Sequence, residues 1–351
     1  MTPPVSLDRQ TAEQTANHAR FRPGERAGHY ESWFQRANHP TRPLAFWIRY
    51  TIFSPADRPG DAVGELWAIV FDGETGQHVA VKREVPIANT SFGRDTFHVR
   101  IGDRDAAELG GERATGALRG AVTGADHRIA WDLRYRGDEP PLLLFPLTFY
   151  EAPLPKAKAL VGVPGAVYEG TIDVDGRTLD VGGWVGSQNH NWGSKHTDRY
   201  AWGQVSGFDD HPRSFLELGT AQLKLGPIWT PNLTPLVLRH QGREHALNGP
   251  GQIVRARASV EYFDWRFASE TRAVRIEGRI FADREDFVGL SYNNPPGGAK
   301  HCLNSKIATC DLTVTYKSGT RAGQVDRLRS TRRAAFEILT DDREHGVAIR
   351  A

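Results

Sequence analysis

The segment from Gly186 to Asp210 concentrates side chains that can form hydrogen bonds or transfer protons. It reads GSQNHNWGSKHTDRYAWGQVSGFDD and contains two imidazoles close together. His190 is a candidate catalytic residue, because an imidazolium can supply a proton near neutral pH. The other polar and aromatic members of the segment are candidate ligand-binding residues: Asn189, Asn191, His196, Tyr200, Trp202 and Gln204.

The two halves of this segment predict different local structures. Glycines and asparagines favour a loop over the first half, because they tolerate left-handed backbone geometry. Alternation over residues 199–206 predicts a strand with Tyr200, Trp202 and Gln204 on one face. Aromatic groups with polar tips suit a largely apolar ligand that carries one hydrogen-bonding group. A self-capped loop with Trp192 in the core is the structural alternative, and it explains the two asparagines equally well.

Carboxylic acids placed among apolar residues are the second kind of candidate. Glu31 shares a predicted strand face with Trp33 in YESWF, and Asp264 shares one with Tyr262 in VEYFDWRF. Burial raises the pKa of a carboxyl group and lets it donate a proton near neutrality. Glu31 and Asp264 are therefore candidate catalytic residues, with Trp33 and Tyr262 as ligand-binding residues. A rim position for Glu31 and an exposed strand face for Asp264 are the alternatives.

Two further acids follow the same pattern. Glu217 lies between two leucines in SFLELG and is the fourth candidate catalytic residue, while Asp132 alternates with Trp131 and Leu133. A zinc site at His190, His196 and His211 is not favoured, because the spacing matches no common zinc motif. The sequence also lacks a nucleophile elbow, a P-loop, a dinucleotide-binding glycine motif and HExxH. We therefore expect no metal and no cofactor, which leaves acid–base chemistry or plain binding.

Composition excludes several classes of protein. The chain has 351 residues, 39% hydrophobic and 25% charged, with a net charge of +2, so a folded core is expected and nucleic acid is not an expected partner. No apolar run is long enough for a transmembrane helix, and the first 21 residues lack the apolar core of a signal peptide. The two cysteines, Cys302 and Cys310, fit a reducing compartment and predict a cytoplasmic location. The oligomeric state stays open.

Short alternating segments separated by glycine and proline run through the whole sequence. They predict an all-β sandwich or barrel rather than alternating strands and helices, with strand content above one third. Residues 6–20, which begin at a capping Ser6, have no apolar face and predict a surface helix or a loose arm. The predicted strands span residues 44–53, 65–72, 96–101, 127–135, 167–174, 199–206, 214–222, 259–267, 272–281 and 310–317.

A proline-rich stretch predicts the boundary between two β units. Residues 149–170 contain Pro153, Pro155 and Pro164, and proline disfavours a central strand. The predicted organisation is an N-terminal arm over residues 1–24, a β domain over residues 25–160 and a second β domain over residues 161–351.

Three segments resemble the tandem lipocalin-like superfamily of carotenoid 1,2-hydratase (hydroxyneurosporene synthase), tocopherol cyclase and lipocalin-like Diels–Alderases. They are GHYESWFQRANHPTRPLAFWIRYTIFSP (28–55), the block over residues 127–209 with its HNWG…YAW run, and YNNPPGGAKHCLNSKIATC (292–310). The resemblance implies two lipocalin-like antiparallel β-barrels or half-barrels packed side by side. It also implies an apolar ligand in a barrel mouth or between the domains.

Two functions remain open on these observations. The first is a hydratase or cyclase that protonates a terpenoid, polyene or polyketide-like molecule without a cofactor. The second is a carrier that binds a hydrophobic small molecule without chemistry. In either case we expect Gly186–Asp210 to close the second barrel's mouth. His190, Tyr200 and Trp202 would then point at one ligand cavity, which Glu31 and Trp33 from the first domain could share.

Overall fold

The fold consists almost entirely of antiparallel β structure. The computed structural model describes residues 8–103, 105–112 and 114–351, and more than half of these residues lie in strands. In this part of the chain the α-helices are three short segments: α1 (Arg9–Gln14), α2 (Leu147–Glu151) and α3 (Pro250–Arg255). The all-β prediction is therefore confirmed.

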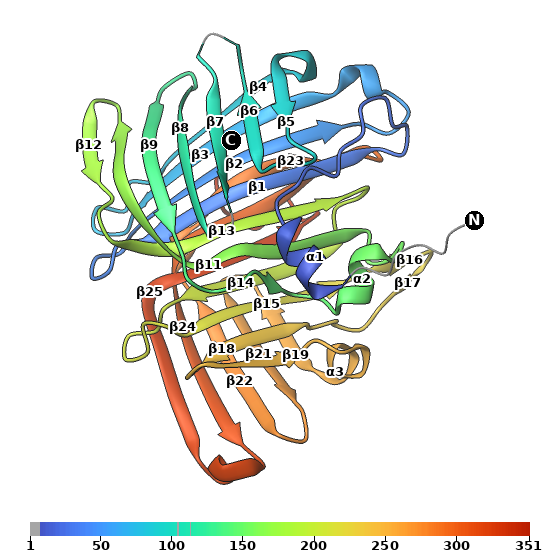
Figure 1. Ribbon diagram of the computed structural model, residues 1–351, viewed down its shortest axis with the longest axis vertical. Helices are drawn as coiled ribbons and strands as arrows, with labels where there is room; N and C mark the ends of the chain where they lie inside the picture. The colour runs from blue at the N-terminus through green and yellow to red at the C-terminus, as the bar shows by residue number, and fades with distance from the viewer. Residues whose placement is uncertain (1–7, 104, 113) are drawn as a thin grey trace.

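The strands form two large sheets that lie against each other (Figure 1). The first sheet has 13 strands and curls until β4 approaches β8, so it forms a nearly closed barrel. In sheet order its path is β4 (Val79–Pro86), β3 (Val63–Asp72), β2 (Leu44–Ser54), β1 (His29–Asn38), β13 (Trp184–Gly193), β11 (Ala157–Val174), β9 (Arg128–Arg136), β8 (Thr115–Thr123), β7 (Ala107–Glu112), β6 (His98–Ile101) and β5 (Thr90–Phe92). Two short strands, β10 (Leu142–Leu143) and β12 (Arg177–Asp180), pair with β11.

The second sheet has 10 strands and contains the C-terminal part of the chain. Its path is β19 (Arg243–Leu247), β18 (Leu236–His240), β15 (Phe215–Gln222), β14 (Arg199–Ser206), β25 (Val325–Thr340), β24 (Ala299–Tyr316), β22 (Val274–Phe281), β21 (Asp264–Glu270) and β20 (Arg257–Glu261), with β23 (Val288–Asn293) paired to β24. A separate hairpin consists of β16 (Lys224–Leu225) and β17 (Ile228–Trp229). Together the two sheets confirm the predicted side-by-side lipocalin-like architecture.

Strand β2, at the contact between the sheets, carries apolar side chains on both faces. In β2, Ile48 and Tyr50 point into the first sheet's core, while Trp47 packs in a cluster between the two sheets. That cluster also contains Tyr292 and Leu339 from the second sheet. Burial on both faces explains why β2 reads as a continuous hydrophobic run.

The proline-rich stretch does not separate the two sheets, so that prediction is wrong. Residues 157–174 form β11, which pairs with both β13 and β9 inside the first sheet. Pro164 fits there because it lies beside a register shift, where the ladder is already interrupted. The chain passes to the second sheet over residues 194–198. Whether residues 25–160 and 161–351 fold as independent domains stays a prediction.

Three local predictions also need correction. The first half of the Gly186–Asp210 segment is not a loop, because residues 184–193 form β13 and pair with β1 and β11 on both sides. Residues 259–267 are not one strand, because Tyr262 and Phe263 form the turn between β20 and β21 and Phe263 has a φ of 70°. The N-terminal segment is not loose, because Ala16 and Phe21 are buried. Ser6 lies outside the described residues, and Asp8 caps α1.

Two strand glycines provide a test of how tightly the sheets are packed. A Cβ atom on Gly186 would collide with the backbone of Arg36, whereas one on Gly219 would meet only the oxygen of Ala201, at 3.7 Å. We expect Gly186→Ala to lower the free energy of unfolding by about 2 kcal/mol or more, as overpacking does. Gly219→Ala is the matched control and should change it by less than about 1 kcal/mol. Urea unfolding measures both, and equal losses would contradict the predicted contrast.

Candidate functional site

The predicted site residues of the first sheet lie on its two different faces, and most of the others lie in the second sheet. Side chains of β1 and β13 alternate, so Glu31, Trp33 and His190 point into the barrel. Asn189 bonds to residues between the two sheets instead. The structure therefore does not place His190 and Trp202 around one cavity. Two separate groups result, one inside the first barrel and one between the sheets.

Glu31 is the centre of the group inside the barrel. Its carboxylate accepts the backbone N–H groups of Arg20 at 2.7 Å and Phe21 at 2.8 Å. The ring nitrogens Nε2 of His190 and His29 lie 2.8 and 3.0 Å from the same carboxylate. Burial raises the pKa of Glu31, but the hydrogen bonds with the two histidines outweigh it and lower this pKa to about 2. Glu31 is thus an ionised anchor for the N-terminal segment and a poor proton donor.

His190 links the same segment to the barrel wall. Its Nδ1 lies 2.6 Å from the carbonyl oxygen of Ala16, which can only accept, so Nδ1 carries a proton. The ring stacks on Trp33 at 4.8 Å and lies 4.7 Å from the half-buried Trp192. The indole of Trp33 donates to the carbonyl oxygen of Asn17. Residues 16–21 therefore cover the barrel mouth, and His190 and Trp33 hold them there.

The group between the sheets is built around Glu217. The indole Nε1 of Trp202 donates to one carboxyl oxygen at 2.7 Å, and Nε2 of Gln204 donates to the other at 2.8 Å. The residue is 2% exposed. Burial raises the pKa of Glu217 to about 7 despite these two hydrogen bonds. Near neutral pH it is present in both protonation states, which is what a general acid or base needs.

Gln204 connects Glu217 to the first sheet. Its amide oxygen accepts from Nε of Arg36 at 2.7 Å and from Oγ of Ser187 at 2.6 Å. Its amide nitrogen also donates to Oδ1 of Asn189 at 2.8 Å. The predicted residues Asn189, Gln204 and Glu217 therefore belong to one hydrogen-bond network that spans both sheets.

Arg36 was missed by the sequence analysis. It is fully buried, and burial lowers its pKa to about 10. Its Nη1 donates to Asn38 at 2.7 Å, but Nη2 has no hydrogen-bond partner among the described residues. An arginine among the aromatic and polar residues of YESWFQRAN was the available signal. A buried donor without a partner can bind an oxygen atom of a ligand or a water molecule.

Space for an added side-chain atom remains beside the Glu217 network at Gly219. Trp202 is half-buried and pairs across the ladder with Gly219, where a Cβ atom would have space. On the other side, Nζ of Lys306 lies 5.4 Å from the Trp202 ring and 2.8 Å from Glu337. The indole of Trp202 therefore separates a buried ion pair from the carboxyl group of Glu217.

A cavity of about 570 Å³ opens at one end of the second sheet. It is lined by Ala201, Thr220 and Ile338 from the sheet's inner face and by the predicted residues Tyr200 and Tyr262. Glu217 does not line this cavity, because it lies on the opposite face of β15 from Thr220. The end cavity and the Glu217 network are therefore separate.

Two other predicted residues, His196 and Asn191, differ in their surroundings. His196 is stacked on Tyr30 at 3.9 Å, and burial lowers its pKa to about 3, so it is neutral at physiological pH. Asn191 is half-buried, and its Oδ1 has no hydrogen-bond partner among the described residues. Asn191 therefore remains available to a ligand or water, whereas His196 is a packing residue.

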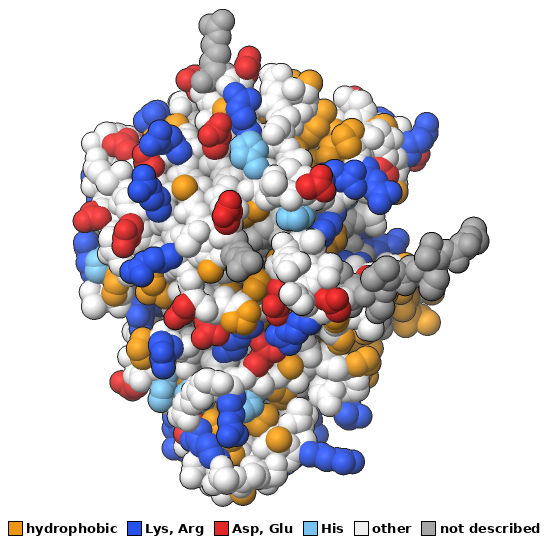
Figure 2. Space-filling model, viewed as in Figure 1, with side chains coloured by type: hydrophobic (Ala, Val, Ile, Leu, Met, Phe, Trp, Pro, Cys, Tyr) orange, Lys and Arg blue, Asp and Glu red, His pale blue; other side chains and the backbone are white. Residues whose placement is uncertain are grey.

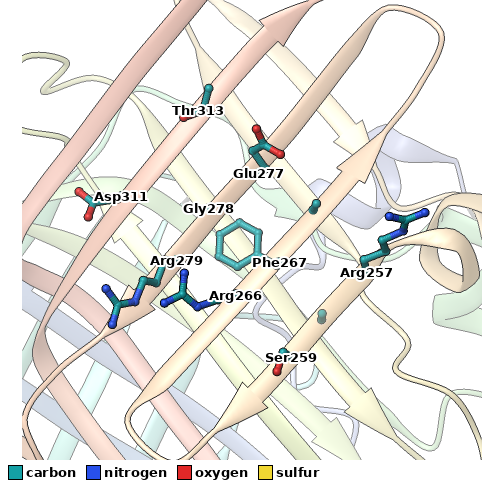
Figure 3. Close-up of a pocket in the computed structure, with 11 residues that line it drawn as sticks. Arg257, Ser259, Arg266, Phe267, Glu277, Gly278, Arg279, Asp311 and Thr313 are labelled. Carbon is teal, nitrogen blue, oxygen red and sulfur yellow. The ribbon is translucent and has the colours of Figure 1, made fainter.

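Asp264 lies on the outer face of the second sheet, where its hydrogen bonds with Arg279 lower its pKa. Arg279 borders a shallow hollow of about 570 Å³. Figure 3 shows Arg266 and Arg279 close together beside the ring of Phe267, with Glu277 near them. An ion-paired surface carboxylate among arginines is not placed to protonate an apolar molecule.

Ser214, His240 and Asp326 form a hydrogen-bonded chain that the sequence analysis also missed. Ser214 Oγ lies 2.7 Å from Nδ1 of His240, whose Nε2 lies 3.0 Å from Asp326. Nucleophilic triads use these groups, but Ser214 is only 4% exposed. Arg321 and Tyr316 also bind Asp326. These hydrogen bonds therefore connect the strand ends at one edge of the second sheet. No local sequence pattern predicts them.

Comparisons with known proteins agree with this fold. No protein-family model matches the chain. Two uncharacterized proteins of Mycobacterium tuberculosis, from strains CDC 1551 and H37Rv, are each 24% identical over 289 residues, which is 82% of this chain and 82% of each relative.

In the described residues no helix is long and apolar enough to cross a membrane, and no cluster of His, Cys, Asp and Glu could hold a metal ion.

Three solved structures share the architecture. An AttH-like protein from Nitrosomonas europaea has a TM-score of 0.57 at 14% identity and covers 96% of this chain and 98% of its own. Kievitone hydratase from Nectria haematococca has a TM-score of 0.50 at 10% identity, with 89% of both chains covered. CghA with Sch210972 has a TM-score of 0.50 at 11% identity, with 90% and 88% covered. The chain therefore shares the fold of these three structures, in agreement with the resemblance.

The low pKa of Glu31 predicts an acid-dependent contribution to stability. Because this pKa falls from 4.5 to about 2 on folding, the ionised form stabilises the fold above pH 4.5, and this contribution is lost as the pH falls towards 2. We expect Glu31→Gln to lower the free energy of unfolding at pH 7 by on the order of 3 kcal/mol. The difference from wild type should shrink between pH 4.5 and the lowest pH at which both proteins still fold.

The matched control is Glu169→Gln, which changes an exposed glutamate on β11. Urea unfolding at a series of pH values measures all three proteins. A Glu31→Gln penalty that stays constant with pH would contradict the assignment of an ionised anchor.

Proposed function

We propose that the protein is a cofactor-free hydratase or cyclase that protonates a hydrophobic small molecule in the space between its two sheets, with Glu217 as proton donor. The observation that carries this proposal is the environment of Glu217: a buried carboxyl with a pKa of about 7, held between the sheets by Trp202 and Gln204 and beside Gly219, where a Cβ atom would have space. Terpenoid, polyene and polyketide-like molecules are the substrate class that the family resemblance implies.

The hydrogen bonds around Glu217 are compatible with proton donation. Trp202 and Gln204 each bind one carboxyl oxygen, and each oxygen keeps a second lone-pair direction that can carry the proton. The two donors orient the carboxyl group without occupying its acid proton. Catalysis by such a positioned acid typically contributes about 100-fold to 10,000-fold to the rate.

The buried side chain of Arg36 restricts the chemical groups that we expect in the substrate. Its unpartnered Nη2 is buried in the same network, so a carbonyl or hydroxyl oxygen of the ligand would give it an acceptor. A carbonyl conjugated to the double bond would combine both groups. Arg36 would stabilise negative charge on the carbonyl oxygen while Glu217 protonates the α-carbon. Water or an internal hydroxyl would add to the β-carbon, and the proton that it loses would restore the acid form of Glu217.

Solved structures of the same fold support this class of chemistry by analogy. One of them is a kievitone hydratase and another was solved with Sch210972 bound. At 10% and 11% identity their activities do not transfer residue by residue. The proposal therefore depends on Glu217 and Arg36 in this chain.

A carrier function is the second candidate, and the end cavity of the second sheet favours it. A ligand held against Ala201, Thr220 and Ile338 would lie on the far face of β15 from Glu217. Such a ligand would be bound without contact to the proposed acid. Mass spectrometry of molecules extracted from the native protein separates the two, since a carrier releases them unchanged.

The proposed acid gives a direct test. With conjugated enone and polyene candidates, we expect Glu217→Gln to lower kcat at least about 100-fold while the ligand still binds. Wild-type kcat should fall as the pH rises above about 7, because the acid form of Glu217 is lost there. Incubation in D₂O followed by mass spectrometry measures the transferred proton.

Asp264→Asn is the matched control, because it removes another predicted acid from the outer face, and it should leave kcat unchanged. Full activity in Glu217→Gln would refute the assignment. Ligand binding without turnover of any candidate in wild type would favour the carrier.

A further inference from the structure

Large aliphatic side chains are strongly exposed around one end of the second sheet. Leu225 and Ile228 at the β16–β17 turn are 61% and 69% exposed, Val254 on α3 is 56% exposed, and Leu154 after α2 is 59% exposed. Figure 1 shows α2, α3 and the β16–β17 hairpin on the same side of the molecule. We call these four residues the aliphatic rim.

Hydrogen bonds connect the segments that carry the aliphatic rim. The start of β11, three residues after Leu154, pairs with Gly193 at the end of β13. The segment that follows Gly193 contains Asp198, whose carboxylate accepts the N–H of Lys224 in the hairpin at 3.0 Å. Beyond the hairpin, Thr234 donates to the carbonyl oxygen of Ile253 in α3 at 3.0 Å. The segments that carry the exposed aliphatic groups are therefore connected to one another by hydrogen bonds.

Cations and an indole accompany the aliphatic groups. The half-buried ring of Trp229 lies 4.7 Å from the guanidinium of Arg199 and 5.8 Å from Nζ of Lys224. Lys156 and Arg255 are exposed beside Leu154 and Val254. No acidic residue occurs between residues 211 and 243 except Glu217, which is buried. Figure 2 shows hydrophobic and basic side chains together on this side.

We propose that the aliphatic rim docks on the surface of an anionic lipid bilayer. Exposed aliphatic side chains flanked by Lys, Arg and Trp match the interfacial region of a membrane, where apolar groups enter and cations meet lipid phosphates. A protein partner fits less well, because protein interfaces are depleted of lysine and rest on a flat, packed centre. Four separated aliphatic tips do not form such a centre.

Docking in this orientation would place the end cavity against the bilayer. Arg199, at the rim, also lines that cavity, together with Asn232 from the loop after the hairpin. A hydrophobic ligand could then pass from the lipid to the protein without crossing water. This last step rests on the proposed function, whereas docking itself does not.

Sedimentation with vesicles tests the docking surface. The full chain should bind vesicles of phosphatidylcholine mixed with phosphatidylglycerol, bind phosphatidylcholine alone more weakly, and be released by high salt. Leu225→Asp combined with Ile228→Asp should reduce vesicle binding at least tenfold. The matched control is Val325→Asp, which charges an equally unpartnered aliphatic group, 46% exposed, beside the β24–β25 turn at the bottom of Figure 1. It should leave binding unchanged.

Three outcomes overturn the proposal. Unchanged vesicle binding in the double variant, or absence of binding in wild type, excludes the aliphatic rim as a membrane surface. Light scattering that shows a dimer lost only in the double variant identifies a second copy of the chain as the occupant. If circular dichroism shows that the double variant does not fold, Val254→Asp alone replaces it. Glu217-dependent turnover of a substrate dispersed in water should persist in the double variant, so docking and catalysis can fail separately.

Discussion

The side chain of Gln204 uses all four of its hydrogen-bonding positions. These hydrogen bonds connect the two sheets, and the packing of one sheet against the other depends on them. Its oxygen accepts from Arg36 and Ser187, and its nitrogen donates to Asn189 and Glu217. Two large sheets that bury polar groups between them must pair those groups, because each unpaired one costs about 1–3 kcal/mol. The Gln204 amide pairs four such groups from both sheets and sets the position of the carboxyl group that we propose as the acid.

Glu31 and Glu217 illustrate what a sequence can and cannot predict about a site. Both are single acids within apolar strands, and both are buried. Glu31 receives two backbone N–H groups and two imidazoles, so its pKa falls to about 2, whereas Glu217 receives an indole and an amide, and its pKa rises to about 7. Except for His29, two residues before Glu31, these donors lie 10 or more residues away in the sequence. Strand periodicity gives the face of a residue but not the partners that other strands bring to it.

The fold was easier to predict from the sequence than the site, and the wrong predictions have physical causes. Alternation identified the all-β class and strands such as β2, β3, β9 and β14, because a strand buried on one face must alternate. It covered only parts of β11 and β24 and missed β8 and β25. Asn189 and Asn191 predicted a loop, yet hydrogen bonds from both neighbouring strands hold that backbone extended in β13. Pro164 predicted a linker, yet a register shift in β11 accommodates it. In each case tertiary pairing outweighed a local preference. Arg36 and the Ser214–His240–Asp326 chain depend on such pairing, and local patterns could not reveal them.

The N-terminal segment has a consequence for how the chain tolerates proteolysis. Residues 22–27 are exposed, while residues 16–21 are held by Glu31, His190 and Trp33 inside the barrel mouth. A protease that cut the exposed stretch would break the covalent connection without removing any of those contacts. The released peptide would remain bound as a second fragment, because its departure would leave the Glu31 carboxylate buried without its two backbone donors. A nicked molecule would therefore behave in solution as an intact one until denaturant separates its pieces.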